Sequence, residues 1–172
     1  MSSILKVDQL QDSGGNNLVT SNGSGVITAA GFGKVGQVVT NTSTTATTTT
    51  SASYVDTNIS ASITPSSTSS KIMIIVSGSL FNGTANTSAK ATIFRGNASS
   101  GTNLGDSTWG MINAYDQGNP CVSNGGMNFL DSPSTTSSQL YTVAIAHETG
   151  GNTAIYIPNG QKGSITLMEI LP

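Results

Sequence analysis

The C-terminal stretch, residues 128–172, contains short apolar runs separated by turn residues and has no helical period. The runs cover residues 140–145, 154–157 and 165–171 and are rich in Ile, Val, Leu and Tyr. Clusters of Gly, Asn, Ser and Pro lie between them. Short runs of β-branched and aromatic residues cut by such clusters are typical of antiparallel strands. This stretch therefore predicts an all-β fold.

The last apolar run should lie inside a sheet, because an exposed strand this apolar would aggregate. Side chains alternate along a strand, so Ile165 and Leu167 share one face with Glu169, while Met168 and Ile170 share the other. A carboxylate on the first face is expected to reach water or a polar partner. We therefore predict that Met168 and Ile170 face the core.

Three segments upstream extend the β pattern. Residues 55–63 alternate between apolar and polar side chains, as in a half-buried strand. Residues 71–81 are apolar on both faces, which predicts a central strand or a strand with one face packed on another subunit. The Thr-rich and Ser-rich residues 40–53 contain no Gly or Pro, and we expect an edge strand or loop within the domain rather than a linker.

Residues 1–34 are too few to fold alone, and residues 35–172 form the main domain. An Asp-Ser-Gly-Gly-Asn-Asn turn at 12–17 and an Asn-Gly pair at 22–23 predict small β-hairpins. A hairpin alone is marginal in water. Three copies about a threefold axis would bury Leu18, Val19, Val26 and Ile27. Alternatively, the segment is a flexible arm that orders on binding its dock. Either interpretation makes it the attachment end, with candidate docking residues Ile4, Leu5, Val7 and Leu10.

The composition excludes several functional classes. Charged residues make up 8% of the chain, hydrophobic residues 35%, and the net charge is −2. The polar surface must therefore come from Ser, Thr, Asn and Gly, which suits extracellular β-structure. Six scattered Lys and Arg residues indicate no nucleic-acid surface. No apolar run approaches the roughly 18 residues of a membrane span, and we expect neither membrane insertion nor a signal peptide.

Cys121 and His147 are the single cysteine and the single histidine. One cysteine excludes a disulfide framework within the chain. A catalytic Cys–His pair is one interpretation, and a half-buried structural cysteine is the more common one. His147 and Glu148 are adjacent, so on a strand they point to opposite faces and form no dyad.

The acidic residues show no spacing that is typical of a metal or hydrolase site. Asp106, Asp116 and Asp131 do not follow a Ca²⁺-loop pattern. No pair of carboxylates indicates glycoside hydrolysis, and we expect Asp131 to cap its own turn. The sequence predicts no catalytic residue, no metal and no cofactor, and so no enzyme.

The region 96–126 is the least regular and reads mostly as loops, with a strand at 109–112. Aromatic and amide residues on loops suit recognition of carbohydrate or protein. A tryptophan in the core is the alternative interpretation. The candidate surface-recognition residues are Trp109, Tyr115 and Asp116.

Four segments carry a resemblance to known proteins. They are ILKVDQLQDSGGNNLVTSNGSGVIT at residues 4–28, SYVDTNISASITPSSTSSKIMIIVSG at 53–78, FLDSPSTTS at 129–137 and SITLMEI at 164–170. They resemble tail-fibre-like and other virion fibre proteins of tailed bacteriophages, especially marine ones. The first is similar to the N-terminal segment of such fibres.

The resemblance and the residue patterns together predict a jelly-roll-like antiparallel sandwich of about eight strands, trimeric, with a short N-terminal β attachment segment. The expected function is that of a fibre or spike component that contacts a host glycan or protein and docks other virion proteins through residues 1–34. The expected location is the virion, assembled in the host cytoplasm and then extracellular. A capsid decoration or head-fibre protein is the alternative. A polysaccharide depolymerase is a third, for which the chain is short and poor in acids.

Overall fold

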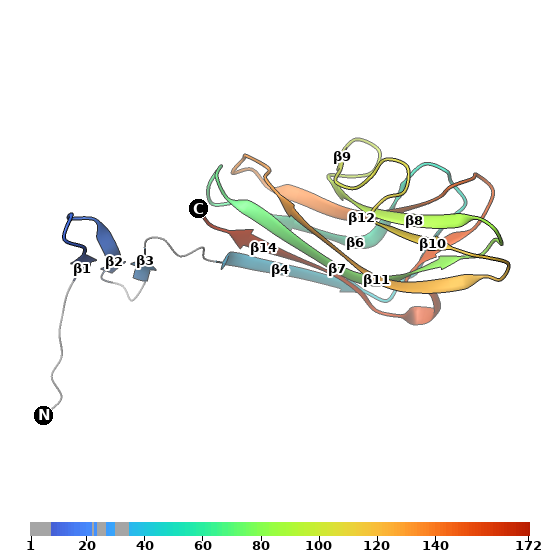
Figure 1. The fold of residues 1–172 in the computed structure, drawn as a ribbon, viewed down its shortest axis with the longest axis horizontal. Coiled ribbons are helices and arrows are strands. Elements are labelled where there is room, and N and C mark those ends of the chain that lie inside the picture. Colours follow the sequence, from blue (N-terminus) through green and yellow to red (C-terminus); the bar gives the residue numbers. More distant parts are fainter. Residues whose placement is uncertain (1–7, 22, 24–26, 30–34) are drawn as a thin grey trace, which may run out of the picture. The chain divides into compact units, whose positions relative to one another are not determined.

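The computed structural model describes residues 8–21, 23, 27–29 and 35–172. The chain divides into two compact units, Met1–Lys34 and Val35–Pro172, shown in Figure 1. Apart from one 3-10 turn, η1 (Pro158–Gly160), every regular element in these residues is a strand. None of the described helical segments has the length and hydropathy needed to cross a membrane. The predicted all-β class is confirmed.

The first unit contains a three-stranded antiparallel sheet of order β1-β2-β3, built from β1 (Gln9–Gln11), β2 (Asn17–Ser21) and β3 (Ile27–Ala29). The turn after β1 forms where the sequence predicts it. Asp12 Oδ1 accepts hydrogen bonds from the backbone N–H groups of Gly14 at 2.8 Å and Asn16 at 2.9 Å. These bonds satisfy the turn's backbone donors locally.

The second unit is a sandwich of two antiparallel sheets. Its long strands are β4 (Val35–Ser43), β6 (Val55–Ile63), β7 (Lys71–Asn82), β8 (Ser88–Arg95), β10 (Ile112–Tyr115), β11 (Cys121–Asp131), β12 (Gln139–His147) and β14 (Gly163–Ile170). One sheet runs β4-β14-β7-β11 and the other β6-β12-β8-β10. The short strands β5 (Thr47–Thr49) and β13 (Ala154–Tyr156) extend the first sheet, and β9 (Thr102–Asn103) extends the second.

The pairing of these long strands follows a nested order. The first long strand pairs with the last (β4 with β14), the second with the next to last (β6 with β12), and so on through β7 with β11 and β8 with β10. A chain folded as one long hairpin and wrapped into two sheets has this topology, which is that of a jelly roll. The predicted jelly-roll-like sandwich is therefore confirmed.

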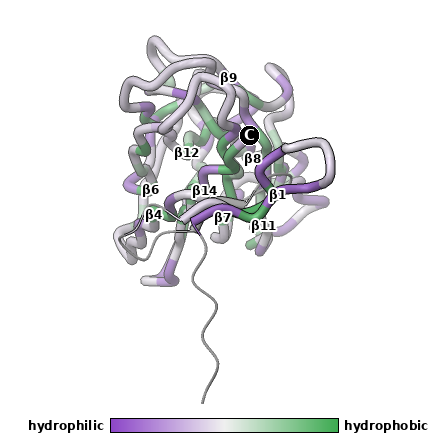
Figure 2. Tube along the Cα trace, turned by 90° about the vertical axis from the view of Figure 1, so that its left-hand side faces the viewer, coloured by the Kyte–Doolittle hydropathy of each residue, from purple (hydrophilic) through white to green (hydrophobic). Residues whose placement is uncertain are grey.

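The core lies between the two sheets. The alternation in β6 predicts one face with Val55, Thr57, Ile59, Ala61 and Ile63. The last four are buried, whereas Val55 at the start of the strand is 38% exposed. Figure 2 shows the hydrophobic stretches on strands of both layers. The largest side chains with no more than 2% exposure are Tyr141, Tyr156, Ile59, Ile63, Ile72, Ile74, Leu80, Ile93, Ile145, Ile157, Ile165 and Leu167.

The C-terminal strand β14 lies between β4 and β7, so the prediction that the chain's last strand is inside a sheet is confirmed. The prediction of its inward face is wrong. Ile165 and Leu167 are fully buried and Glu169 is 1% exposed, whereas Met168 and Ile170 are only half-buried. The core face is thus the face that carries the carboxylate.

Glu169 is accommodated because the turn between β6 and β7 and the neighbouring strand β4 supply its hydrogen-bond donors. Its Oε1 accepts from Ser66 N at 2.6 Å and Ser66 Oγ at 2.7 Å, and its Oε2 accepts from Gln37 Nε2 at 3.0 Å. Burial raises the pKa of Glu169, but these hydrogen bonds favour the charged form more strongly and lower the pKa to about 2.

The strand β7 is central, as predicted, because it pairs with β11 on one edge and with β14 and β13 on the other. The Thr-rich segment forms the end of β4 and all of β5, which lie at the edges of the same sheet. This agrees with the expectation of an edge strand or loop within the domain. The region 96–126 is more regular than predicted, because β11 begins at Cys121 and its register with β7 is continuous from Cys121↔Asn82 to Asp131↔Ile72.

Candidate interaction surface

The outer face of the β4-β14-β7-β11 sheet carries a row of apolar side chains. The strand registers place Val38 beside Met168, Met168 beside Met73, and Met73 beside Leu130. Directly opposite residues on neighbouring strands lie close enough for their side chains to pack together. We call Val38, Met168, Met73 and Leu130 the apolar row.

The apolar row is accessible. Val38 is 57% exposed and Leu130 is 47% exposed, while Met73 and Met168 are half-buried. Ile75, which is 40% exposed, lies next to the row on β7. An antiparallel sheet that faces water normally alternates apolar residues inside with polar residues outside. A contiguous apolar band on the outer face is typical of a surface that contacts another molecule.

The same face becomes polar and hollow beyond Ile75. A hollow of about 410 Å³ is lined by Ser77, Gly78, Ser79, Asn124, Gly125, Gln161 and Lys162. Its floor comes from β7 and β11, and its wall from the segment that follows η1. The outer face therefore has two chemically different regions.

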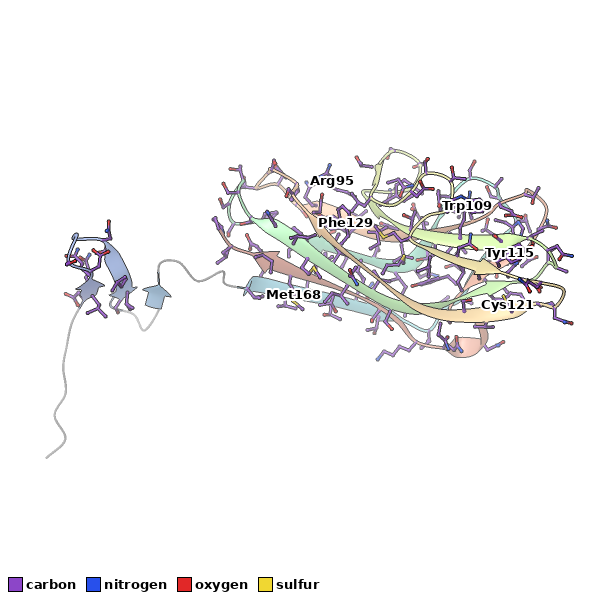
Figure 3. All side chains as sticks on the ribbon, in the orientation of Figure 1. Arg95, Trp109, Tyr115, Cys121, Phe129 and Met168 are labelled. Atoms are coloured by element: carbon purple, nitrogen blue, oxygen red, sulfur yellow. The ribbon has the colours of Figure 1, made fainter. Side chains whose placement is uncertain are left out.

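Two of the three candidate recognition residues are at the surface. Trp109 is 53% exposed and Tyr115 is 55% exposed, and in Figure 3 both lie in the half of the sandwich away from Met168. Trp109 belongs to the loop before β10 rather than to the predicted strand at 109–112.

The loop that carries Trp109 is held by hydrogen bonds. Asp106 Oδ1 accepts from the N–H groups of Thr108 at 2.8 Å and Trp109 at 2.7 Å. The buried Lys90 donates from Nζ to Thr108 O at 2.9 Å, and the same Nζ lies 5.4 Å from the ring centroid of Tyr54. These hydrogen bonds hold the loop that carries the exposed indole of Trp109.

The third candidate, Asp116, does not reach the surface. It is 3% exposed, and its Oδ1 accepts from the N–H groups of Gly118 at 2.7 Å and Asn119 at 2.6 Å. Asp side chains commonly hold turns in this way. Its role as a surface-recognition residue is therefore corrected to that of a turn residue.

The candidate docking residues Ile4, Leu5 and Val7 lie outside the described residues. The fourth, Leu10, lies in β1 and is 54% exposed, and Leu18 in β2 is 43% exposed. Both leucines leave apolar surface for a partner. The part of Leu10 in docking stays a prediction.

Cys121 and His147 have separate partners. Cys121 Sγ donates to Tyr115 O at 3.6 Å and the residue is half-buried, as the common interpretation predicts. His147 is fully buried. Its Nε2 lies 3.1 Å from Thr87 Oγ1 and 3.2 Å from Asn82 Oδ1, while its Nδ1 accepts from Thr149 N at 3.1 Å. These partners indicate that His147 joins strand ends.

The prediction that Asp131 caps its own turn is wrong. Its Oδ2 accepts from Tyr141 Oη at 2.7 Å, and Arg95 Nη1 lies 3.1 Å from Oδ2 and 3.3 Å from Oδ1. Asp131 is on β11, whereas Arg95 and Tyr141 are on β8 and β12. The cluster therefore links the two sheets. Within the described part of the chain, no group of three or more His, Cys, Asp or Glu residues could hold a metal ion.

Comparisons with known proteins give little further information. No protein-family model matches the chain, and no curated protein matches it. Among solved structures, the VP2 subviral particle of infectious bursal disease virus matches with a TM-score of 0.36 and 15% identity, and covers 87% of this chain. The Gx strain of the same virus matches with a TM-score of 0.36 and 15% identity over 86% of this chain. The chain spans 41% of each of those chains. At these scores the similarity carries no argument about function.

Proposed function

We propose that this protein is a structural component of a virus particle, a trimeric fibre or spike subunit of a tailed bacteriophage, without catalytic activity or cofactor. The observation that carries the proposal is the apolar row on the outer face of a jelly-roll sheet. Only 8% of the residues are charged, and the rest of the polar surface comes from uncharged side chains. Four neighbouring apolar side chains on the outer face of a sheet therefore indicate that another subunit covers them. The sequence resemblance to phage fibre proteins supports the same conclusion.

The partner that fits the apolar row is a further copy of this chain. The row contains no charge, so copies that meet around a rotational axis bring no like charges together. Methionine and branched aliphatic side chains adapt to each other's shape when they pack. The exposed Leu10 and Leu18 of the first unit present a second apolar surface, which we assign to docking on other virion proteins.

Light scattering on the purified chain tests self-association. We expect a trimer at micromolar concentration. Leu130→Glu places a charge in the apolar row and should give a folded monomer, because a charge buried at an interface without a partner is costly. Val55→Glu is the matched control: Val55 is 38% exposed, also on an edge strand, but in the other sheet. A monomeric wild type, or equal dissociation by both variants, would contradict the proposal.

Immunogold labelling of the source virus tests the location. Antibodies against the sandwich should label the tail or its fibres, and label spread over the capsid would instead identify a decoration or head-fibre protein.

Trp109→Ala and Tyr115→Ala test host contact, because both side chains are exposed. We expect slower adsorption of particles with unchanged assembly. Unchanged adsorption by both variants would place host contact elsewhere.

A further inference from the structure

The hollow on the β7–β11 part of the sheet is encoded by a run of small outward residues. The register places Ser79 opposite Asn124 and Ser77 opposite Gly126. On both sides of this run the outward pairs are large, Met73 with Leu130 at one end and Phe81 with Val122 at the other. The depression is therefore a property of the sequence at these positions, bounded by bulkier side chains along both strands.

Two glycines in the hollow have different reasons to be there. A Cβ on Gly78 would collide with the hydroxyl of Tyr156, which lies beneath the strand. A Cβ on Gly125 would meet Ile112 at an ordinary 3.6 Å, so the packing does not require glycine at that position. The missing side chains of both glycines therefore lie on the core side of the sheet, toward Tyr156 and Ile112. The hollow on the outer face comes instead from the small outward residues Ser77, Ser79 and Gly126.

The lining has the chemistry of a site for a hydroxylated ligand. Ser77 and Asn124 supply a hydroxyl and an amide from the floor. Ser79 Oγ donates to Gln161 Oε1, which occupies the amide oxygen and leaves the amide NH₂ of Gln161 as a donor. Most small-molecule sites are lined mainly by apolar side chains, so this lining disfavours an apolar ligand.

The charge of the hollow further limits the chemical class of the ligand. Lys162 is exposed and is the charged residue among those that line it. A single ammonium suits one carboxylate, whereas sites for phosphates usually combine several cations or Arg side chains. The volume of about 410 Å³ falls within the roughly 300–1,000 Å³ range of small-ligand sites.

We propose that this hollow binds an acidic saccharide, with the uronate carboxylate at Lys162 and the sugar hydroxyls at Asn124, Gln161 and Ser77. The inference goes beyond the proposed virion role and does not depend on it, because it concerns the isolated chain. Failure of saccharide binding would leave self-association and particle location as they are, and a monomeric chain could still bind the sugar.

Titration of the full chain with a galacturonic acid trisaccharide tests the proposal, with the neutral galactose trisaccharide as comparison ligand. We expect saturable binding of the acidic sugar, with NMR shift changes centred on Ser77, Asn124 and Lys162. Lys162→Gln should weaken binding about threefold to tenfold, as for loss of one exposed ion pair. Lys71→Gln is the matched control: Lys71 is also exposed, but lies at the far end of β7.

Asn124→Leu fills the hollow and should abolish binding, whereas Asn128→Leu, at an exposed outward position further along β11, should not. Thermal melting of each variant shows that it is folded. The proposal is overturned by absence of saturable binding to the acidic sugar, by shift changes that lie outside the hollow, or by equal losses in Lys162→Gln and Lys71→Gln. Equal affinity for the neutral sugar would overturn the assignment of Lys162 to a carboxylate.

Discussion

Two buried tyrosines differ in whether their hydroxyl groups are hydrogen-bonded. Tyr141 and Tyr156 both have 0% exposure. The hydroxyl of Tyr141 donates to Asp131, whereas that of Tyr156 has no hydrogen-bond partner among the described residues. Burial raises the pKa of both phenols, and for Tyr141 the hydrogen bond to Asp131 raises it further. One hydroxyl is therefore satisfied and the other is not.

We predict that Tyr141→Phe destabilises the protein by roughly 1.5–3 kcal/mol, because it removes a hydrogen bond to a charged group. Tyr156→Phe should stabilise it by about 1 kcal/mol, because it removes a buried polar group that lacks a partner. Denaturant unfolding of both variants measures the difference. Destabilisation by both changes would show that Tyr156 has a partner, such as a buried water.

Glu169 provides a second test at the scale of the residue. Glu169→Gln removes the charge that accepts from Ser66 and Gln37 and should cost roughly 1.5–3 kcal/mol at neutral pH. Ile170→Ala should cost less than about 1 kcal/mol, because Ile170 is half-buried and points outward. A larger loss from Ile170→Ala would mean that the facing of β14 is reversed.

The stabilisation by Glu169 should also depend on pH. The folded-state pKa is about 2 and the ordinary value is 4.5. A lowered pKa stabilises the folded state above the ordinary value, and this stabilisation is lost as the pH falls from about 4.5 toward 2. The difference in melting temperature between wild type and Glu169→Gln should therefore shrink over that range. A constant difference from pH 6 to pH 3 would contradict the assigned hydrogen bonds.

At the scale of the element, β14 connects the parts of its sheet. It pairs with the edge strand β4 on one side and with the central strand β7 on the other. Its inward residues Ile165 and Leu167 are fully buried. Without this strand, β4 has no neighbour and β7 loses one edge.

We predict that a chain ending at residue 162 does not fold, because it exposes the edges of β4 and β7 and leaves the core without two large side chains. A chain that lacks only Leu171 and Pro172 should fold normally, since both lie beyond the last strand. Circular dichroism and limited proteolysis compare the two. A folded, protease-resistant form of the shorter chain would show that the strand is dispensable.

At the scale of the whole molecule, the chain is two units of very different size. The second contains the sandwich core, whereas the first is a three-stranded sheet whose Leu10 and Leu18 are exposed. A sheet this small has little stability of its own in water. Most of the stability should therefore belong to residues 35–172.

We predict that residues 35–172 alone unfold at nearly the melting temperature of the full chain. In virions, this shorter form should be absent, because the proposed docking surface is missing. Calorimetry measures the first outcome and mass spectrometry of purified particles the second. Normal incorporation of the shorter form would place docking in the sandwich.

Much of this architecture follows from local sequence. Short apolar runs, separated by turns of Gly, Asn and Pro, predict strands at residues 55–63 and 71–81 and at the C-terminus. Side chains alternate between the two faces of a strand, so the face of each one depends only on its own strand. The exposed apolar residues of β7 could also be anticipated, since the strand is apolar on both faces.

The tertiary structure decided what depends on partners distant in sequence. The strand β11 contains Ser, Asn and Gly where a strand signal is weak, and it forms because β7 offers a complete edge for pairing. The inward position of Glu169 depends on Ser66, about a hundred residues earlier (a separation of 103), and the role of Asp131 depends on Arg95 and Tyr141. The hollow likewise requires β7, β11 and the segment after η1 to meet. Burial of a polar group is favourable only when its partner is in place, and local sequence does not contain that partner.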